Sequence, residues 1–332
     1  MPLFGKRKSV ADYIKRLSEA LSNIPNISDE TALRTIHHEI NKCSHNLRDM
    51  LYHAEDTAAT DNEAVTEFIK HNLVRLILST FTSLEFEARK DIISVLSHLL
   101  CDTLFVNHLL SLPDAFSSIM TLYTNPSLTI HTGTFIREGV VKSSAICNHF
   151  LTMDTMNLLF GFVNVESFDI SSDAFSTLNT LLTSHKDITA DFINANYTDF
   201  FKGFEGLILS ENYVIRRSSL RLLAEILLER SCFEIMTRFI SEMHNLKVVM
   251  NLLLTKSRHI QYEAFHVFKI FVANPNKTSA IENVLCRNSQ KLVLFLEKFH
   301  CDGDDQLEEE VSLLIKEIQM IGGTCEEEQD SN

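Results

Sequence analysis

An apolar helical face recurs at a fixed interval in the C-terminal half of the chain. Phe175, Leu220 and Phe265 follow one another at 45-residue intervals. Each is followed by apolar residues three and seven positions later, namely Leu178 and Leu182, Leu223 and Leu227, and Phe268 and Val272. Since such spacings lie along one stripe of an α-helix, each segment predicts a helix with one buried face. This period is typical of HEAT and armadillo repeats, so we expect an all-α, armadillo/HEAT-like helical-repeat solenoid forming a right-handed curved rod.

The pattern weakens toward the N-terminus. Ile92 begins the same apolar spacing, but segment 128–146 fits only partly. Phe135 precedes the next repeat phenylalanine by 40 residues, and Glu138 and Lys142 occupy positions where apolar residues are expected. We interpret this segment as a degenerate repeat, and roughly seven repeats fit the chain. Apolar patterns and turn residues predict helices near 10–22, 28–52, 63–80, 86–101, 103–111, 114–123, 128–146, 147–165, 168–185, 188–208, 211–230, 232–241, 244–255, 257–273, 277–286, 288–300 and 305–320.

Charge is distributed unevenly along the 332 residues. The net charge is −14, and −10 of it lies between Cys301 and Asn332, where Lys316 is the one basic residue. A nearly neutral body with an acidic end is a poor match for nucleic acid, so no nucleic-acid partner is expected. We predict a flexible N-terminal lead at 1–8, a single repeat domain at 9–321, a last helix that ends at Gly322–Gly323, and a disordered acidic tail at 322–332.

Seven cysteines without a Cys-x-x-Cys pair predict reduced, packed thiols in a cytoplasmic protein. The basic N-terminus lacks the apolar region of a signal peptide, and no apolar run has the length of a membrane span. We therefore expect no membrane partner. We also expect the protein to be a monomer.

The motifs of several catalytic classes are missing from the sequence. It has no Gly-x-Gly-x-x-Gly, no Walker phosphate loop, no His-Glu-x-x-His and no Gly-x-Ser-x-Gly. Asp169 and Asp173 have the spacing of a carboxylate pair, but acids at a helix start have an electrostatic reason to be there. We expect a protein that is not an enzyme and has no cofactor.

Two clusters have a weak resemblance to metal sites. His37, His38 and His45 fall on one predicted helix, and the acidic run Asp302, Asp304 and Asp305 resembles the start of a calcium loop. The histidines have no supporting cysteines, and the acidic run lacks the glycine and later ligands that a calcium loop needs. Solvated side chains are the favoured interpretation, so no metal is expected.

A basic cluster leaves two interpretations open. Arg216, Arg217, Arg221 and Arg230 belong to the segment whose buried stripe begins at Leu220. On an exposed face these arginines would bind a partner's carboxylates. Alternatively they pair with acids on the same helix, namely Glu211, Glu225 or Glu229. Phe168 and Phe233 raise a similar question, with packing in the core as the default. Met250 could belong either to the core or to the floor of a peptide pocket.

Three stretches resemble a known family. They are Ser167–Phe175, Ser210–Val214 and Arg258–Thr278, and the opening Met1–Lys6 is similar as well. Together they resemble the calcium-binding protein 39 family, also called the morula protein 25 family, most densely from about Glu166 to Lys298. The resemblance implies a non-catalytic armadillo-like scaffold of the cytoplasm. Such a scaffold binds a Ste20-related pseudokinase, with a second serine/threonine kinase in a ternary complex, or activates germinal-centre kinases directly.

The resemblance also implies contact residues. Phe168, Tyr213, Arg217 and Arg221 match positions that contact the kinase or pseudokinase on the concave surface, with arginine at 221 where the family usually has lysine. Arg230 and Phe233 match the pair that contacts the activated kinase. Met250 and Arg287 match the pocket for a Trp-Glu-Phe peptide, and lysine is again usual at position 287. The alternative function is a helical-repeat adaptor for another partner, such as a transport protein or RNA.

Overall fold

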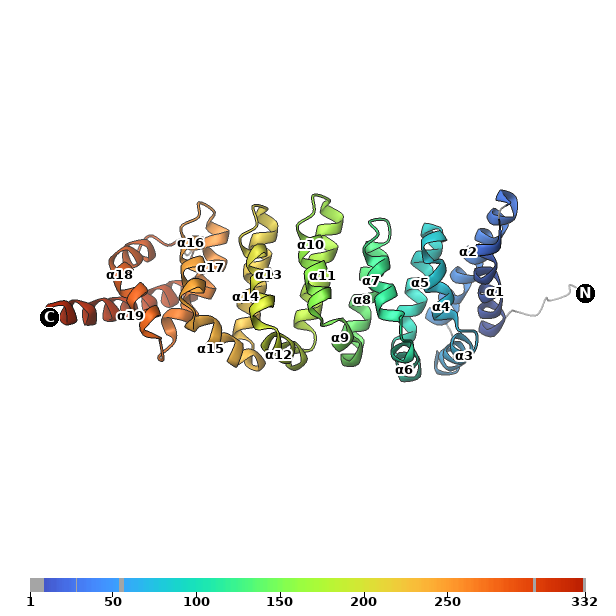
Figure 1. The fold of residues 1–332 in the computed structure, drawn as a ribbon, viewed down its shortest axis with the longest axis horizontal. Coiled ribbons are helices and arrows are strands. Elements are labelled where there is room, and N and C mark those ends of the chain that lie inside the picture. Colours follow the sequence, from blue (N-terminus) through green and yellow to red (C-terminus); the bar gives the residue numbers. More distant parts are fainter. Residues whose placement is uncertain (1–8, 28, 54–56, 301–302, 331–332) are drawn as a thin grey trace, which may run out of the picture. The chain divides into compact units, whose positions relative to one another are not determined.

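The computed structural model describes residues 9–27, 29–53, 57–300 and 303–330 (Figure 1). Across those ranges the chain forms nineteen α-helices, three short 3-10 helices and no β-strand. It groups into two compact units, Met1–Thr189 and Ala190–Asn332. The all-α helical-repeat fold predicted from the sequence is confirmed. The predicted lead at 1–8 lies outside the described residues, and the assignment of 9–321 to a single domain stays a prediction.

The first unit contains eleven complete α-helices and the start of a twelfth. Their bounds are α1 Val10–Asn23, α2 Glu30–Tyr52, α3 Thr57–Lys70, α4 Leu73–Thr80, α5 Phe86–Leu99, α6 Thr103–Ser111, α7 Ala115–Tyr123, α8 Thr129–Lys142, α9 Ser144–Phe150, α10 Met153–Val163, α11 Phe168–Thr183 and α12 Lys186–Ala195. Within this unit α2 packs on α5, α5 on α8, and α8 on α11. These four helices are therefore the repeated layer of the unit.

The second unit continues the same plan. Its helices are α13 Tyr197–Ile208, α14 Tyr213–Leu228, α15 Phe233–Ser241, α16 Met243–Leu253, α17 Arg258–Ala273, α18 Ser279–Leu296 and α19 Asp305–Asp330. Here α14 packs on α17 and α17 on α19, while α13 and α16 cover α14 and α17. Leu220 and Phe265, two of the residues that define the 45-residue period, are fully buried. The period therefore identifies the helices that carry the core.

The degenerate repeat has a structural explanation. It forms α8, where Phe135 is buried as expected. Lys142 stands at an expected apolar position because its ammonium group donates to the carbonyl oxygen of Ser97 on α5, at 2.6 Å. It also pairs with Glu138, at 3.1 Å. The charges at this site thus join two repeats instead of breaking the pattern.

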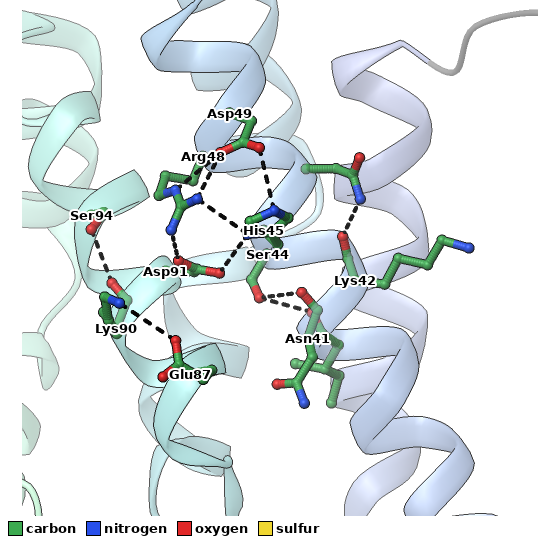
Figure 2. A network of polar contacts seen from close by, with 12 residues as sticks. Asn41, Lys42, Ser44, His45, Arg48, Asp49, Glu87, Lys90, Asp91 and Ser94 are labelled. Atoms are coloured by element: carbon green, nitrogen blue, oxygen red, sulfur yellow. Dashed lines mark hydrogen bonds and ion pairs between the residues drawn. The ribbon is translucent and has the colours of Figure 1, made fainter.

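Ion pairs connect several of the repeated helices to the next one. In the first unit Arg48 of α2 pairs with the buried Asp91 of α5, within the network that Figure 2 shows. Arg137 of α8 pairs with Asp173 of α11, at 2.8 Å. The second unit has Arg217 of α14 with Glu263 of α17, at 3.2 Å, and Lys269 of α17 with Glu310 of α19, at 2.8 Å. A basic side chain on one repeat thus pairs with an acid on the following repeat in both units.

Several predicted helix boundaries were wrong. The segments 63–80, 147–165 and 188–208 each form two helices, because polar residues start a second helix inside the apolar pattern. Asn72 has a left-handed backbone with φ of 50°, Thr152 caps α10 through the backbone N–H of Thr155, and Asn196 precedes α13. Conversely, 277–286 and 288–300 form the single helix α18, and α19 continues past Gly322 to Asp330.

The cysteines and the apolar helices refine two further predictions. Cys43 and Cys147 are buried free thiols, as predicted, but Cys101 is exposed. Cys286 is disulfide-bonded, so the prediction of reduced cysteines is wrong at that position. In the described parts of the chain no single helix has the length and apolar character to cross a bilayer, although α5 and α6, bent by 111°, pass that test as a pair.

Candidate binding surfaces

Helix α14 presents the clearest candidate surface in the second unit. Asn212 caps it by accepting hydrogen bonds from the backbone N–H groups of Val214 and Ile215. The buried stripe holds Leu220 in the core, so Arg217 and Arg221 lie on the exposed side of the helix. Tyr213, its first residue, is also exposed. The local sequence therefore places two guanidinium groups and a phenol outside the core.

The two arginines of this face differ in their surroundings. The Arg217 side chain is 44% exposed, and its Nε donates to the Glu263 carboxylate, which is only 9% exposed. Arg217 therefore pairs with an acid on the neighbouring helix α17. The sequence had suggested either a partner protein or an acid on the same helix. Arg221 makes no hydrogen bond or ion pair within the described ranges. Arg216 donates to the carbonyl oxygen of Ser210, at 2.7 Å, and so braces the loop before the helix.

Arg230 and Phe233 lie at the junction of α14 and α15. Phe233 is 64% exposed although it begins a helix in which Ile235, Phe239 and Ile240 are buried. Both residues line a cavity of about 370 Å³ with Leu228, Met236 and Ile270. A larger cavity of about 780 Å³ shares Phe233 and extends to α19, where Leu313 is exposed. The exposed Phe233 therefore stands over a continuous apolar groove, and the core role that was its default is wrong.

Met250 and Arg287 line one cavity. Met250 belongs to α16 and Arg287 to α18, which pack against each other. The cavity has a volume of about 580 Å³ and is also lined by Met243, Lys247, Asn251, Ala280, Asn283, Val284 and Asn288. A flexible thioether beside two cationic side chains suits an apolar group that ends in a carboxylate. Two residues 37 positions apart in sequence thus meet at one site.

Phe168 belongs to the first unit. It is the first residue of α11, and its side chain is 73% exposed, so it is not part of the core. Ser171, one turn later, donates its hydroxyl to the carbonyl oxygen of Val163 and fixes the start of the helix. The aromatic ring is therefore held on a well-anchored first turn.

The carboxylate pair considered for catalysis has a structural role. Asp173 is buried and accepts hydrogen bonds from the Tyr123 hydroxyl, at 3.0 Å, and from Arg137. Burial raises the pKa of the Asp173 carboxyl, and the neighbouring Arg137 opposes that rise. Asp169 is exposed. The two carboxylates therefore lie in different environments, and Asp173 belongs to the contact between α8 and α11.

The candidate metal clusters do not converge. His45 contacts Asp49, at 3.3 Å, and Asp91, at 3.5 Å, beside Arg48 (Figure 2). The Arg48 guanidinium pairs with both of these carboxylates. Asp304 caps α19 by accepting from the backbone N–H of Leu307, and Asp302 lies outside the described residues. In the ranges that the structure describes, no three His, Cys, Asp or Glu side chains are placed to hold a metal ion.

The acidic partners of Arg48, Arg217 and Lys269 were not predicted from the sequence. Asp91, Glu263 and Glu310 attracted no attention, because each looks like an ordinary acid on an amphipathic helix. A usable signal was present: each lies 41 to 46 residues after its basic partner, which is one repeat period. A further pocket of about 300 Å³, formed by α13, α15 and α16 around Tyr197, was also missed.

Residues 2–322 match the Mo25-like family. The chain belongs to that family. MO25-like protein 2 of Caenorhabditis elegans is 39% identical over 335 residues, covering 96% of this chain and 98% of the relative. The human protein named calcium-binding protein 39-like is 34% identical, covering 98% and 99%. Among solved structures, a designed armadillo repeat protein covers 77% of this chain and 99% of its own, with a TM-score of 0.45 and 10% identity. The resemblance noted in the sequence thus extends over nearly the whole Mo25-like chain.

Proposed function

We propose that this Mo25-like protein is a non-catalytic scaffold that binds a kinase or pseudokinase and stabilises its closed, active conformation. Family membership supports the scaffold role. The observation that carries the finer proposal is Arg221, an exposed guanidinium without a partner in the described chain, on a helix whose other exposed arginine is already paired. A cation that the fold does not use is available to a partner's carboxylate.

The mechanism needs binding energy and no chemistry from the scaffold. A protein kinase is active only when its helix αC is positioned so that a glutamate pairs with the strand lysine. A surface that contacts the closed form better than the open form shifts the population toward the closed form. The activation that results is limited by the difference between the two affinities. In our proposal Tyr213 and Arg221 of the second unit, and Phe168 of the first, supply such contacts.

The remaining site residues have separate tasks in the proposal. Arg230 and Phe233, at the apolar groove, contact the second serine/threonine kinase of a ternary complex. Met250 and Arg287 hold a short Trp-Glu-Phe peptide of the pseudokinase, with the aromatic group over the thioether and a carboxylate on the guanidinium. The cytoplasm is the compartment in which such partners would be met.

Arg221→Ala tests the kinase surface. We would measure the affinity of the full chain for a Ste20-related pseudokinase and the activity of a germinal-centre kinase with and without it. The loss of one charge-assisted hydrogen bond predicts an affinity about 10- to 100-fold weaker. The melting temperature should stay unchanged, because Arg221 has no partner in the described chain. Arg34→Ala on α2, an exposed arginine paired only with Glu30, is the control and should have no effect on binding.

Two results would contradict the proposal. One is the absence of binding to either class of kinase, and the other is an equal effect of both arginine variants. Salt-dependent binding to RNA that disappears in Arg216→Ala would favour the adaptor alternative instead.

The peptide cavity has its own experiment. A synthetic peptide ending in Trp-Glu-Phe is titrated into the full chain and followed by fluorescence anisotropy. Met250→Ala and Arg287→Glu should each weaken binding at least about tenfold, since each removes one of the two kinds of contact. Lys291→Glu, the same charge change on an exposed residue of the same helix outside the cavity, should leave it unchanged. If both cavity variants bind the peptide as tightly as the unmodified chain, this site is no longer part of the proposal.

A further inference from the structure

Three helices of the first unit begin side by side. Helices α5, α8 and α11 pack consecutively. Lys142, the last residue of α8, reaches Ser97 near the end of α5, so these two helices run in the same direction. At their starts the Phe86 and His131 rings meet with centroids 5.1 Å apart. Further along, Arg137 reaches Asp173 and His185 reaches the carbonyl oxygen of Val140. This register places the first turns of the three helices in one row.

Each of these first turns exposes a large apolar side chain. Phe86 is 62% exposed, Ile130 is 51% exposed and Phe168 is 73% exposed. We call these three residues the first-turn patch. Single exposed apolar residues are common on protein surfaces, whereas a row of them on adjacent helices marks an interaction site. Two of the three are phenylalanines, which bury a large area on binding.

The surroundings of the first-turn patch are predominantly acidic. Glu85 and Glu87 flank Phe86 in the chain, and Glu166 and Asp169 lie close to Phe168. Two basic residues also lie near Phe86, because Arg89 donates to the carbonyl oxygen of Thr82 and Lys90 pairs with Glu87, at 3.5 Å. The four acids still outnumber these two bases. The pKa of His131 is lowered by burial, so this histidine adds no charge near neutral pH. The patch is therefore apolar with a negative rim.

We propose that the first-turn patch docks a segment of the partner kinase or pseudokinase that carries apolar side chains along one face and lysines or arginines beside them. The identity of the partner rests on the proposed function, whereas the chemistry of the segment rests on the patch itself. Apolar anchors supply the buried area, and opposite charges at the rim steer the segment and fix its orientation. Phe168 is thus the end of a longer surface that includes Phe86 and Ile130.

The chemistry is tested directly with two synthetic amphipathic helices of about 18 residues, long enough to hold one face. Both have leucines on one face, and the polar positions are lysine in one peptide and glutamate in the other. The full chain should bind the lysine peptide at least about tenfold more tightly, and salt raised from about 0.05 to about 0.5 M should reduce that difference. Equal affinity for the two peptides would overturn the proposal.

Variants locate the binding. Phe86→Ser combined with Ile130→Ser should weaken the lysine peptide at least about tenfold. The control is Leu104→Ser combined with Val141→Ser, which removes two equally exposed apolar residues of the same unit outside the patch. Equal loss in both double variants would overturn the assignment. Tighter peptide binding after deletion of residues 1–8, whose Leu3, Phe4 and Lys6 have similar chemistry, would show that the chain's own segment is the occupant.

Binding to the pseudokinase separates the two proposals. If both Arg221→Ala and the patch double variant weaken it, both proposals stand. If only Arg221→Ala weakens it, the proposed function stands and the docking segment is overturned. If no kinase or pseudokinase binds while the lysine peptide still needs Phe86 and Ile130, the proposed function fails and the patch is left as a docking surface for a basic segment of another protein.

Discussion

The exposed faces of α11 and α14 differ in charge although both helices occupy the same place in their repeats. On α11 of the first unit the exposed side chains beyond Phe168 are Asp169, Ser172 and Ser176, so this face carries no positive charge. On α14 of the second unit they include Arg217 and Arg221. In our proposals the first unit binds through its apolar first turns, whereas the second unit binds through the arginines along α14.

The inter-repeat ion pairs show which charges are structural. Arg137 in the first unit and Arg217 in the second each pair with an acid on the following repeat, so each has a role without any partner protein. Arg221 has no counterpart on α11, where the residue eight positions after Phe168 is Ser176. Arg217 therefore contributes to the stability of the fold, and Arg221 is the better residue with which to test binding.

Truncating the period-defining phenylalanines should produce the largest effects and separate the two units. Phe265→Ala in the second unit removes a fully buried ring and should lower the free energy of unfolding by about 3–5 kcal/mol. Phe175→Ala in the first unit should cost only about 1–2 kcal/mol, because that ring is half-buried. Denaturant unfolding followed by circular dichroism measures both. Equal losses would mean that the two repeats share one core environment.

The same comparison can be made for the ion pairs. Arg137→Ala leaves Asp173 buried without its cation and removes a hydrogen bond to Thr177, so we expect a loss of about 3 kcal/mol. Arg217→Ala should cost about 1–2 kcal/mol, because the Arg217 side chain is nearly half exposed and water can replace part of the pair. Identical losses would contradict the difference in burial.

Two helical glycines give an opposite pair of outcomes. A Cβ on Gly133 of α8 would lie 2.2 Å from the Asp173 carboxylate, so Gly133→Ala should cost about 1–3 kcal/mol. A Cβ on Gly206 of α13 has no neighbour within 4 Å, so Gly206→Ala should stabilise by about 0.5–1 kcal/mol through helix propensity. The melting temperatures should move in opposite directions. A stabilising Gly133→Ala would show that α8 and α11 are not closely packed.

The sequence predicted what depends on period and composition. The apolar spacing at Phe175, Leu220 and Phe265 identified the repeated helices, because burying a stripe is a local requirement that each helix must meet. It failed at Asn72, Thr152 and Asn196, where one polar residue decides whether a helix continues or restarts. At Gly322 a helix end was predicted where the helix in fact continues, because glycine lowers helix propensity without ending a helix.

The candidate sites were predictable to different degrees. Exposure of Phe168 and Phe233 could not be read from the chain, because an aromatic at a helix start suits a core or a surface equally well. The partner of Arg217 lies 46 residues away and depends on the register between α14 and α17. Met250 and Arg287 came from the family resemblance alone, and only the packing of α16 on α18 explains why they share a cavity.

The smallest expected effect is a pH dependence shared by both units. Burial lowers the pKa of His131 in the first unit, with Arg89 adding to the effect, and it lowers that of His266 in the second, where Lys269 also contributes. The folded protein therefore resists protonation of these rings while the unfolded chain accepts it near pH 6.5, so stability is complete above that pH and declines below it.

Both histidines should contribute to this decline in stability. Denaturation midpoints measured between about pH 7.5 and pH 5.5 test this, because carboxylates titrate mostly at lower pH. His131→Gln and His266→Gln should each flatten the decline, whereas His38→Gln, on an exposed side chain, should leave it unchanged. If only His266→Gln flattens the decline, water reaches His131 in the first turn of α8. The ring contact between His131 and Phe86 would then be too open to hold Phe86 in the first-turn patch.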